Sequence, residues 1–175
     1  MTTDDEQVFT DIYEEHRDAV HAYLLGRTSD PAAASDLLQE TFLRLWRRLD
    51  DVRDLGPDRR RAWLFTVARN LTIDLYRTRA TSRARDEALA RNQSPPHPDD
   101  PGIPEQVALA EQLDTLHGLI AALPEEQRVV LTMSTVAGMT SERIAATLDI
   151  PAGTVRYRLH QARRSLAADL TDPEE

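Results

Sequence analysis

The chain has 175 residues, a hydrophobic fraction of 41%, a net charge of −9 and no cysteine. This length accommodates one ordinary domain or two small ones, and the lack of cysteine excludes disulfides and thiolate metal sites, which leaves five scattered histidines as the only soft ligands. No apolar run approaches the roughly 18 residues that cross a bilayer, and the N-terminus is acidic where a secretory signal would be basic, so we expect a cytoplasmic protein without membrane insertion.

The first fifty residues predict two amphipathic helices. The first begins near residue 4 and ends around Gly26, where glycine suits a C-terminal cap. Asp30 followed by Pro31 predicts the cap and first turn of the second helix, which runs to about residue 50. One side of this second helix is apolar. The other is charged but carries Leu37 and Leu43, which we expect to be exposed.

The next stretch is locally basic, although the chain as a whole is acidic. Residues 1–50 carry eleven acids and five arginines, whereas residues 51–93 carry six acids and ten arginines. A third helix over 58–79 lies in this stretch. Because aromatic and arginine side chains share the side opposite its core stripe, this helix is either buried from two directions or presents those side chains to a ligand.

A proline- and aspartate-rich segment follows. Residues 94–104 have no helical period, and no basic residue occurs from 92 to 127. The composition predicts an extended linker.

The C-terminal part predicts four helices. They cover 109–123, 124–136, a short segment through Leu148 that Thr140 or Ser141 caps, and a last helix after a tight turn over 149–153. A short helix, a tight turn and a second helix indicate a helix-turn-helix. Its last helix has an apolar side, and the opposite side has the chemistry for base reading. The alternative interpretation of this opposite side is a solvated arginine-rich face. Its residues are Arg156, Tyr157, His160, Arg163 and Arg164.

No segment shows convincing strand alternation, so the predicted fold class is all-α. We expect two small helical domains joined by an extended linker, with the first domain at 1–80, the linker at 81–104 and the second domain at 105–170.

Four segments in series resemble the extracytoplasmic-function (ECF) sigma factors, which belong to the sigma-70 family of bacterial RNA polymerase. These segments are 36–46, 63–77, 123–131 and 150–159. The resemblance covers nearly the whole chain in the correct order, and it implies a non-catalytic specificity subunit that directs promoter-specific initiation without a cofactor or metal. The implied domains are sigma region 2 and sigma region 4.

The resemblance also implies site residues. The core polymerase would dock on Asp36, Leu37, Gln39, Glu40, Leu43 and Arg44. The −10 element would be captured as single-stranded DNA. It would contact Arg59, Arg60, Arg61, Arg69, Asn70, Arg77 and Arg79. Three aromatic residues have two interpretations, a place in the core, which is favoured, or stacking on bases. They are Trp63, Phe65 and Tyr76. The −35 duplex would contact Arg143, Thr154, Arg156, Tyr157, Arg158, His160, Gln161, Arg163 and Arg164.

The implied partners are promoter DNA and the polymerase core, through the clamp of the largest subunit and the flap of the second-largest subunit. An anti-sigma protein is a further candidate. The linker either threads the polymerase as a mimic of a nucleic-acid strand or is a mere tether. Two departures from the family pattern, Tyr157 and Gln161, prevent the −35 sequence from being borrowed from relatives. A third, Asp149, stands where the family usually has Gly at the turn, although Asp tolerates the left-handed conformation.

Two other classes of protein compete with this interpretation. A stand-alone helix-turn-helix regulator would bind an operator tightly as a dimer, whereas an acidic chain should bind free DNA weakly and gain affinity from a partner. A helical enzyme or metal bundle would need converging ligands, yet no Glu lies three residues before any histidine.

Overall fold

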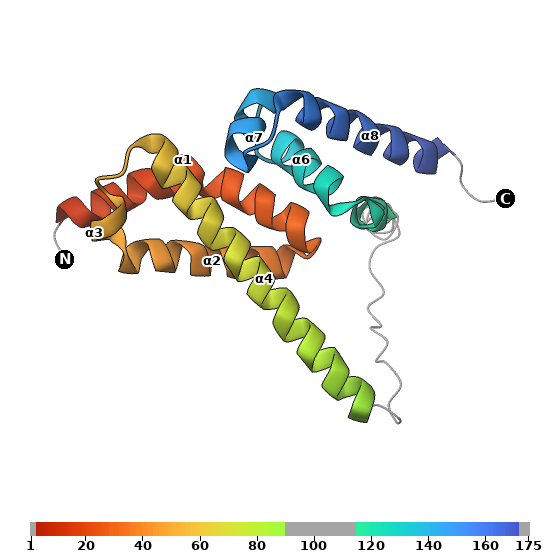
Figure 1. Cartoon of the computed structure of the whole chain (residues 1–175), viewed down its shortest axis with the longest axis horizontal. Coiled ribbons are helices and arrows are strands. Elements are labelled where there is room, and N and C mark those ends of the chain that lie inside the picture. Colours follow the sequence, from red (N-terminus) through yellow and green to blue (C-terminus); the bar gives the residue numbers. More distant parts are fainter. Residues whose placement is uncertain (1–2, 90–114, 172–175) are drawn as a thin grey trace, which may run out of the picture.

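The computed structural model describes residues 3–89 and 115–171, and this part of the chain is helical, without strands (Figure 1). The N-terminal bundle consists of α1 (Thr3–Thr28), α2 (Pro31–Arg47), α3 (Leu49–Val52) and α4 (Pro57–Leu89). The C-terminal bundle consists of helical residues 115–122 followed by α6 (Glu125–Thr135), α7 (Ser141–Leu148) and α8 (Ala152–Thr171). The predicted all-α fold class is confirmed.

At the junction between α1 and α2, the start of α2 agrees with the sequence prediction, but the end of α1 does not. The Asp30 side chain caps α2 and accepts a hydrogen bond from the Ala33 N–H at 3.1 Å, as predicted. The predicted end of α1 at Gly26 is wrong, because α1 continues to Thr28 and the left-handed residue after it is Ser29, with φ of 54°. Gly26 is therefore an interior helical residue.

Two further helix ends differ from the sequence prediction. The helix expected to reach residue 50 ends at Arg47, and a separate turn, α3, follows after Arg48. The helix expected to end at residue 79 continues to Leu89. Residues 80–89 contain Ala, Arg and Glu, which are good helix formers, and the next proline, Pro95, comes later in the sequence. The linker prediction begins at 81, so its first nine residues lie in α4.

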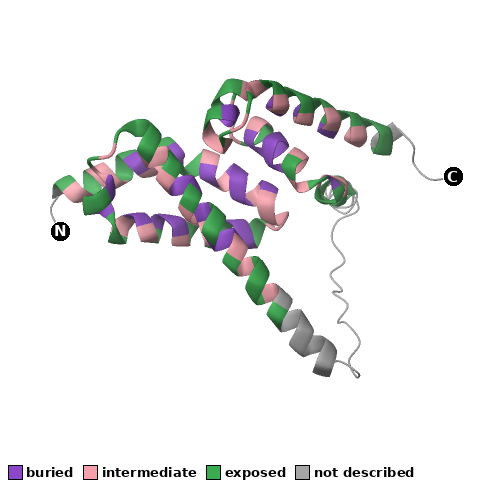
Figure 2. Ribbon diagram, viewed as in Figure 1, coloured by how far each residue is buried: buried purple, intermediate pink, exposed green. Residues whose placement is uncertain are grey.

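A single hydrophobic core runs through both bundles (Figure 2). The most extensive packing between two helices joins α1 of the N-terminal bundle to α6 of the C-terminal bundle. The sequence predicted two modules but gave no sign that they pack on each other. Fully buried members from both bundles include Ile12, Leu24, Leu45, Leu64, Met133, Ile144 and Val155.

Neither a membrane-spanning helix nor a cluster of metal ligands occurs in residues 3–89 and 115–171. None of their helices has both the length and the apolarity that a membrane crossing requires. Among the same residues, His, Asp and Glu side chains nowhere gather in a group of three able to hold a metal ion.

The α2 cap gives a stability prediction. The Ala33 N–H, and after it the Arg79 guanidinium at 2.9 Å, hold the pKa of Asp30 below its ordinary 3.8. Asp30→Ala should lower the free energy of unfolding at pH 7 by about 1 kcal/mol, because it removes the cap. A depressed carboxyl pKa means that this contribution is present above pH 3.8 and is lost as the pH falls through the folded-state pKa.

Urea titrations at neutral and acidic pH measure the effect. Asp30→Asn is the matched control, because Asn is an equally good N-cap and should lose much less stability. Equal stability of wild type and Asp30→Ala at neutral pH would contradict the assignment of the cap.

Candidate nucleic-acid interface

The helix-turn-helix is built from local signals that the sequence already shows. Thr140 caps α7, and its hydroxyl accepts a hydrogen bond from the Arg143 N–H at 3.3 Å. Asp149 ends α7 in the left-handed conformation, with φ of 55°, as its side chain permits. Buried Ile144 from α7 and Val155 from α8 belong to the common core. The two helices are thereby fixed to each other and to α6.

The outer side of α8 carries the arginine-rich face that the sequence predicted. Arg156 also reaches across to α7, where its Nη1 lies 3.2 Å from Oε1 of Glu142. Tyr157 has 64% of its surface exposed. Side chains with such freedom can donate to base edges or phosphates when the helix enters a major groove. The exposed residues of this face are Arg156, Tyr157, His160, Arg163 and Arg164.

The other four residues predicted to contact the −35 duplex lie differently. Arg158 points back to α6, where it pairs with Glu126, and only 22% of its side chain is exposed. Thr154 and Gln161 are half-buried. Arg143 is exposed but lines a cavity together with residues of α1, α4 and the segment between α6 and α7. These four residues are thus not part of the open face of α8.

The seven residues predicted to contact the −10 strand fall into two groups. Arg60 donates to the carbonyl oxygens of Arg53 at 3.0 Å and Leu55 at 3.1 Å, and Arg79 binds the Asp30 cap, so both stabilise local structure. Arg61 is half-buried and pairs with Asp58 at 2.9 Å. The remaining four are exposed along α4: Arg59, Arg69, Asn70 and Arg77.

The three aromatic residues of α4 have different surroundings. Phe65 is buried and packs edge-on against Tyr23, with ring centroids 5.3 Å apart. Trp63 is half-buried against the core. Tyr76 is 37% exposed, and its hydroxyl donates to the Arg27 carbonyl. Phe65 is therefore a core residue, whereas Tyr76 joins α4 to the end of α1.

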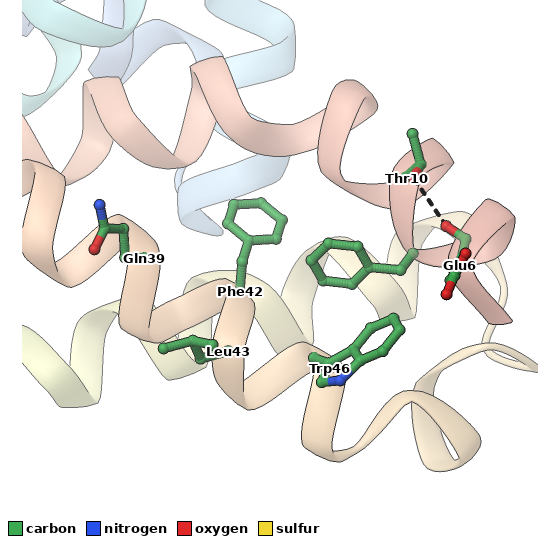
Figure 3. A pocket seen from close by; sticks show the side chains of 7 residues that line it. Glu6, Thr10, Gln39, Phe42, Leu43 and Trp46 are labelled. Atoms are coloured by element: carbon green, nitrogen blue, oxygen red, sulfur yellow. Dashed lines mark hydrogen bonds between the residues drawn. The ribbon is translucent and has the colours of Figure 1, made fainter. Parts of the chain in front are cut away.

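A groove of about 680 Å³ lies between α1 and α2, beside the predicted polymerase-docking face (Figure 3). Leu43, which is 48% exposed, and Gln39 belong both to this groove and to the predicted face. The sequence did not predict the contribution of α1, which supplies Glu6, Phe9 and Thr10. The groove is lined by Glu6, Phe9, Thr10, Gln39, Phe42, Leu43 and Trp46.

The other residues of the predicted docking face differ in how far they are exposed. Leu37 is half-buried against the core, so the expectation that it is exposed is wrong. The Leu37 side chain reaches the core because α2 packs on both α1 and α4. Asp36 is exposed, and Glu40 pairs with Arg44 at 2.9 Å on the same helix. Leu43 is thus the one large apolar side chain that this face presents to solvent among the described residues.

An open arginine-rich face on a helix-turn-helix, joined to a second bundle with a basic helix, defines a helical DNA-binding protein of the transcription machinery. Comparison with known families agrees: residues 12–82 match the sigma-70 region 2 family and residues 113–166 match the sigma-70 region 4 family. The ECF RNA polymerase sigma factor SigL of Mycobacterium tuberculosis is 36% identical over 161 residues, which span 92% of this chain and 88% of SigL.

More distant proteins show the same relationship. The ECF RNA polymerase sigma factor SigW of Bacillus subtilis is 27% identical over 96% of this chain and 91% of its own. The fold resembles that of the sigma factor RpoE in complex with the anti-sigma factor NepR from Bartonella quintana, with a TM-score of 0.62, 23% identity and coverage of 95% and 98%. The chain belongs to the ECF sigma factors. This membership replaces the alternative of a stand-alone regulator.

The exposed guanidinium of Arg156 gives a prediction about DNA binding. Arg156→Ala should weaken binding of a selected −35 duplex relative to a scrambled one by about 1–3 kcal/mol if the guanidinium reads a base. Arg17→Ala is the matched control, because Arg17 is an exposed arginine of α1 outside the residues assigned to DNA and should leave discrimination unchanged. Fluorescence anisotropy on the two duplexes measures both variants. Equal loss of discrimination in both would contradict the assignment.

Proposed function

We propose that this sigma factor divides its work between two bundles, with residues 1–80 docking on core polymerase and capturing the −10 element, and residues 105–170 reading the −35 element. Residues 81–104 join the two. The observation that carries this proposal is the open face of α8, since no other element in the described residues offers so many exposed cationic and aromatic side chains on one helical side. Polymerase performs the chemistry, and this chain supplies the choice of promoter.

At the −35 element, α8 enters the major groove of duplex DNA. Arg156, His160 and Arg163 supply donors for base edges, since an arginine fork fits the O6 and N7 atoms of guanine. Arg143 and Thr154 lie near the start of the two helices of the motif and are suited to phosphates, which position the helix. Arg164 and Tyr157 extend the same surface, whereas Arg158 and Gln161 need to turn outward to take part.

At the −10 element, the exposed side of α4 binds separated strand. Arg59, Arg69 and Arg77 form a cationic track for the backbone, and Asn70 lies among them for contact with an unstacked base. Because Phe65 is in the core, the described part of α4 offers few aromatic platforms for strand separation. This supports a protein that opens a narrow range of promoters.

The docking face on α2 binds the clamp of the largest polymerase subunit. An exposed leucine among charged residues is typical of an interface, because it gains by leaving water while the charges select the partner. Leu43 supplies the apolar contact, and Asp36, Gln39 and Glu40 surround it. The C-terminal bundle contacts the flap of the second-largest subunit.

An anti-sigma protein is a proposed regulator of this chain. The solved structures it resembles include sigma factors in complex with such proteins. The acidic N-terminal half offers charge for a basic partner, with eleven acids in residues 1–50. Such a protein would act in the cytoplasm, where polymerase is found.

Run-off transcription tests the proposed function. Core polymerase with this protein should transcribe a subset of a promoter-fragment library, and core polymerase without it should not. Transcripts that lack any dependence on the protein would overturn the proposal. The selected fragments also give the −35 and −10 sequences that the other experiments need.

The docking face gives a separate prediction. Leu43→Glu should weaken binding to core polymerase by roughly tenfold or more, because it places a charge at the centre of a buried apolar contact. The control is Leu116→Glu, which makes the same change at a 38% exposed leucine of the C-terminal bundle. Pull-down on immobilised polymerase measures both, and circular dichroism checks the fold. Normal binding by Leu43→Glu would refute the docking assignment.

A further inference from the structure

An ion pair joins the two helices of the helix-turn-helix on their exposed side. Oε1 of Glu142, in the first turn of α7, lies 3.2 Å from Nη1 of Arg156, near the start of α8. Both side chains are largely exposed, Glu142 at 71% and Arg156 at 61%. Figure 1 shows α7 beside the first turns of α8, on which it packs. The pair therefore lies at the end of α8 whose side chains approach base edges when such a motif binds DNA.

The place of Glu142 is unfavourable for an acidic side chain in a DNA-binding motif. Phosphates repel a carboxylate, and the first helix of a helix-turn-helix crosses the DNA backbone. The sequence from 140 to 164 contains only two acidic residues. Asp149 is one of them, and it ends α7 in the left-handed conformation, which is a role in the backbone. Glu142 needs a different explanation.

Capping of α7 does not explain Glu142. Thr140 caps this helix, because its hydroxyl accepts a hydrogen bond from the Arg143 N–H. A capping box would place the acidic residue one position later, where Arg143 stands. A carboxylate in the first turn also interacts favourably with the helix dipole, but that interaction does not require a contact with α8. An exposed ion pair adds little to the free energy of folding, so the effect of this contact lies in the direction that it gives to Arg156.

Glu142 contacts only one part of the Arg156 guanidinium. The contact is to Nη1, which leaves the edge formed by Nε and Nη2 for another acceptor. Two parallel N–H groups on one edge match the O6 and N7 atoms of guanine. An unrestrained arginine side chain has many rotamers, and fixing it on binding costs entropy. A guanidinium that Glu142 already holds loses less entropy when it binds a base.

We propose that Glu142 is a positioning residue for recognition of the −35 element, which orients the Arg156 guanidinium for contact with a guanine and opposes binding to other sequences. The contact through Nη1 provides the orientation. The carboxylate charge repels the phosphates of every sequence alike, so binding depends more strongly on the correct base. This proposal rests on the proposed function, because the direction of Arg156 matters only if Arg156 reads a base.

A double-mutant cycle of Glu142 and Arg156 tests the proposal. Core polymerase with the full-length chain is titrated onto a labelled promoter fragment selected by run-off transcription, and onto fragments in which each base pair of the −35 element is substituted in turn. Fluorescence anisotropy gives the affinity for each fragment, and the ratio of the affinities for the selected and the substituted fragment measures discrimination. Arg156→Ala should lower discrimination roughly tenfold at one base pair, which is the one that Arg156 reads.

Glu142→Ala should lower discrimination at the same base pair by roughly threefold or more, because residues in contact are energetically coupled. In the Arg156→Ala background it should have no further effect. It should also raise the affinity for a fragment with a fully scrambled −35 element by roughly twofold, since a repulsive charge is removed. A residue that only stabilised α7 would produce neither result.

Two further variants serve as controls. Glu142→Gln keeps an acceptor oxygen but loses the charge, so it should bind the scrambled fragment as tightly as Glu142→Ala and retain more discrimination. Asp169→Ala removes an exposed carboxylate of α8 about 20 Å beyond Arg156 along the helix, and should leave discrimination unchanged. Circular dichroism checks that all variants keep their helix content, which we expect because both acidic residues are exposed.

Three results would overturn the proposal. The first is unchanged discrimination in Glu142→Ala. The second is an equal loss with and without Arg156, or a loss at another base pair, because Glu142 would then act independently of the guanidinium. The third is an equal loss in Glu142→Gln and Glu142→Ala, because the contact would then have no part in it. A wild-type protein that does not distinguish the selected −35 element from a scrambled one would instead refute the proposed function itself.

Discussion

The close approach of α1 and α6 at Gly26 is the constraint on which the arrangement of this chain depends. Because no side chain separates the two helices there, the Thr132 hydroxyl and the Arg128 guanidinium reach main-chain carbonyls of α1 directly. One core then extends through both bundles. The open face of α8 and the groove beside Leu43 remain on the outside. Arg61 and Arg143 line one cavity, and Arg69 and Arg158 line another.

Charge explains why such an arrangement suits an acidic DNA-binding chain. A net charge of −9 opposes approach to phosphates, and Glu126 of α6 pairs with Arg158, which the resemblance assigned to DNA. Polymerase compensates for the chain's weak affinity for free DNA, because docking brings both bundles to the promoter at a high effective concentration. Two modest binding sites joined by a linker then act together, which makes promoter choice dependent on docking.

Local sequence patterns predicted the helix caps and turns well, but they did not predict the packing between helices that are distant in the sequence. The Asp30 and Thr140 caps and the left-handed Asp149 are set within a few residues, so the sequence contains them. The role of Gly26 depends on a helix more than a hundred residues away, and its interpretation as a cap was therefore wrong. The resemblance assigned Arg158 to the −35 duplex, whereas in the structure its side chain pairs with Glu126 of another helix.

The most direct test of this account is run-off transcription by core polymerase with this protein from a selected promoter, compared with templates in which the −35 or the −10 element is scrambled. The account predicts a transcript only from the template that keeps both elements, because each bundle reads one of them. Equal transcription from the template with a scrambled −35 element would contradict it.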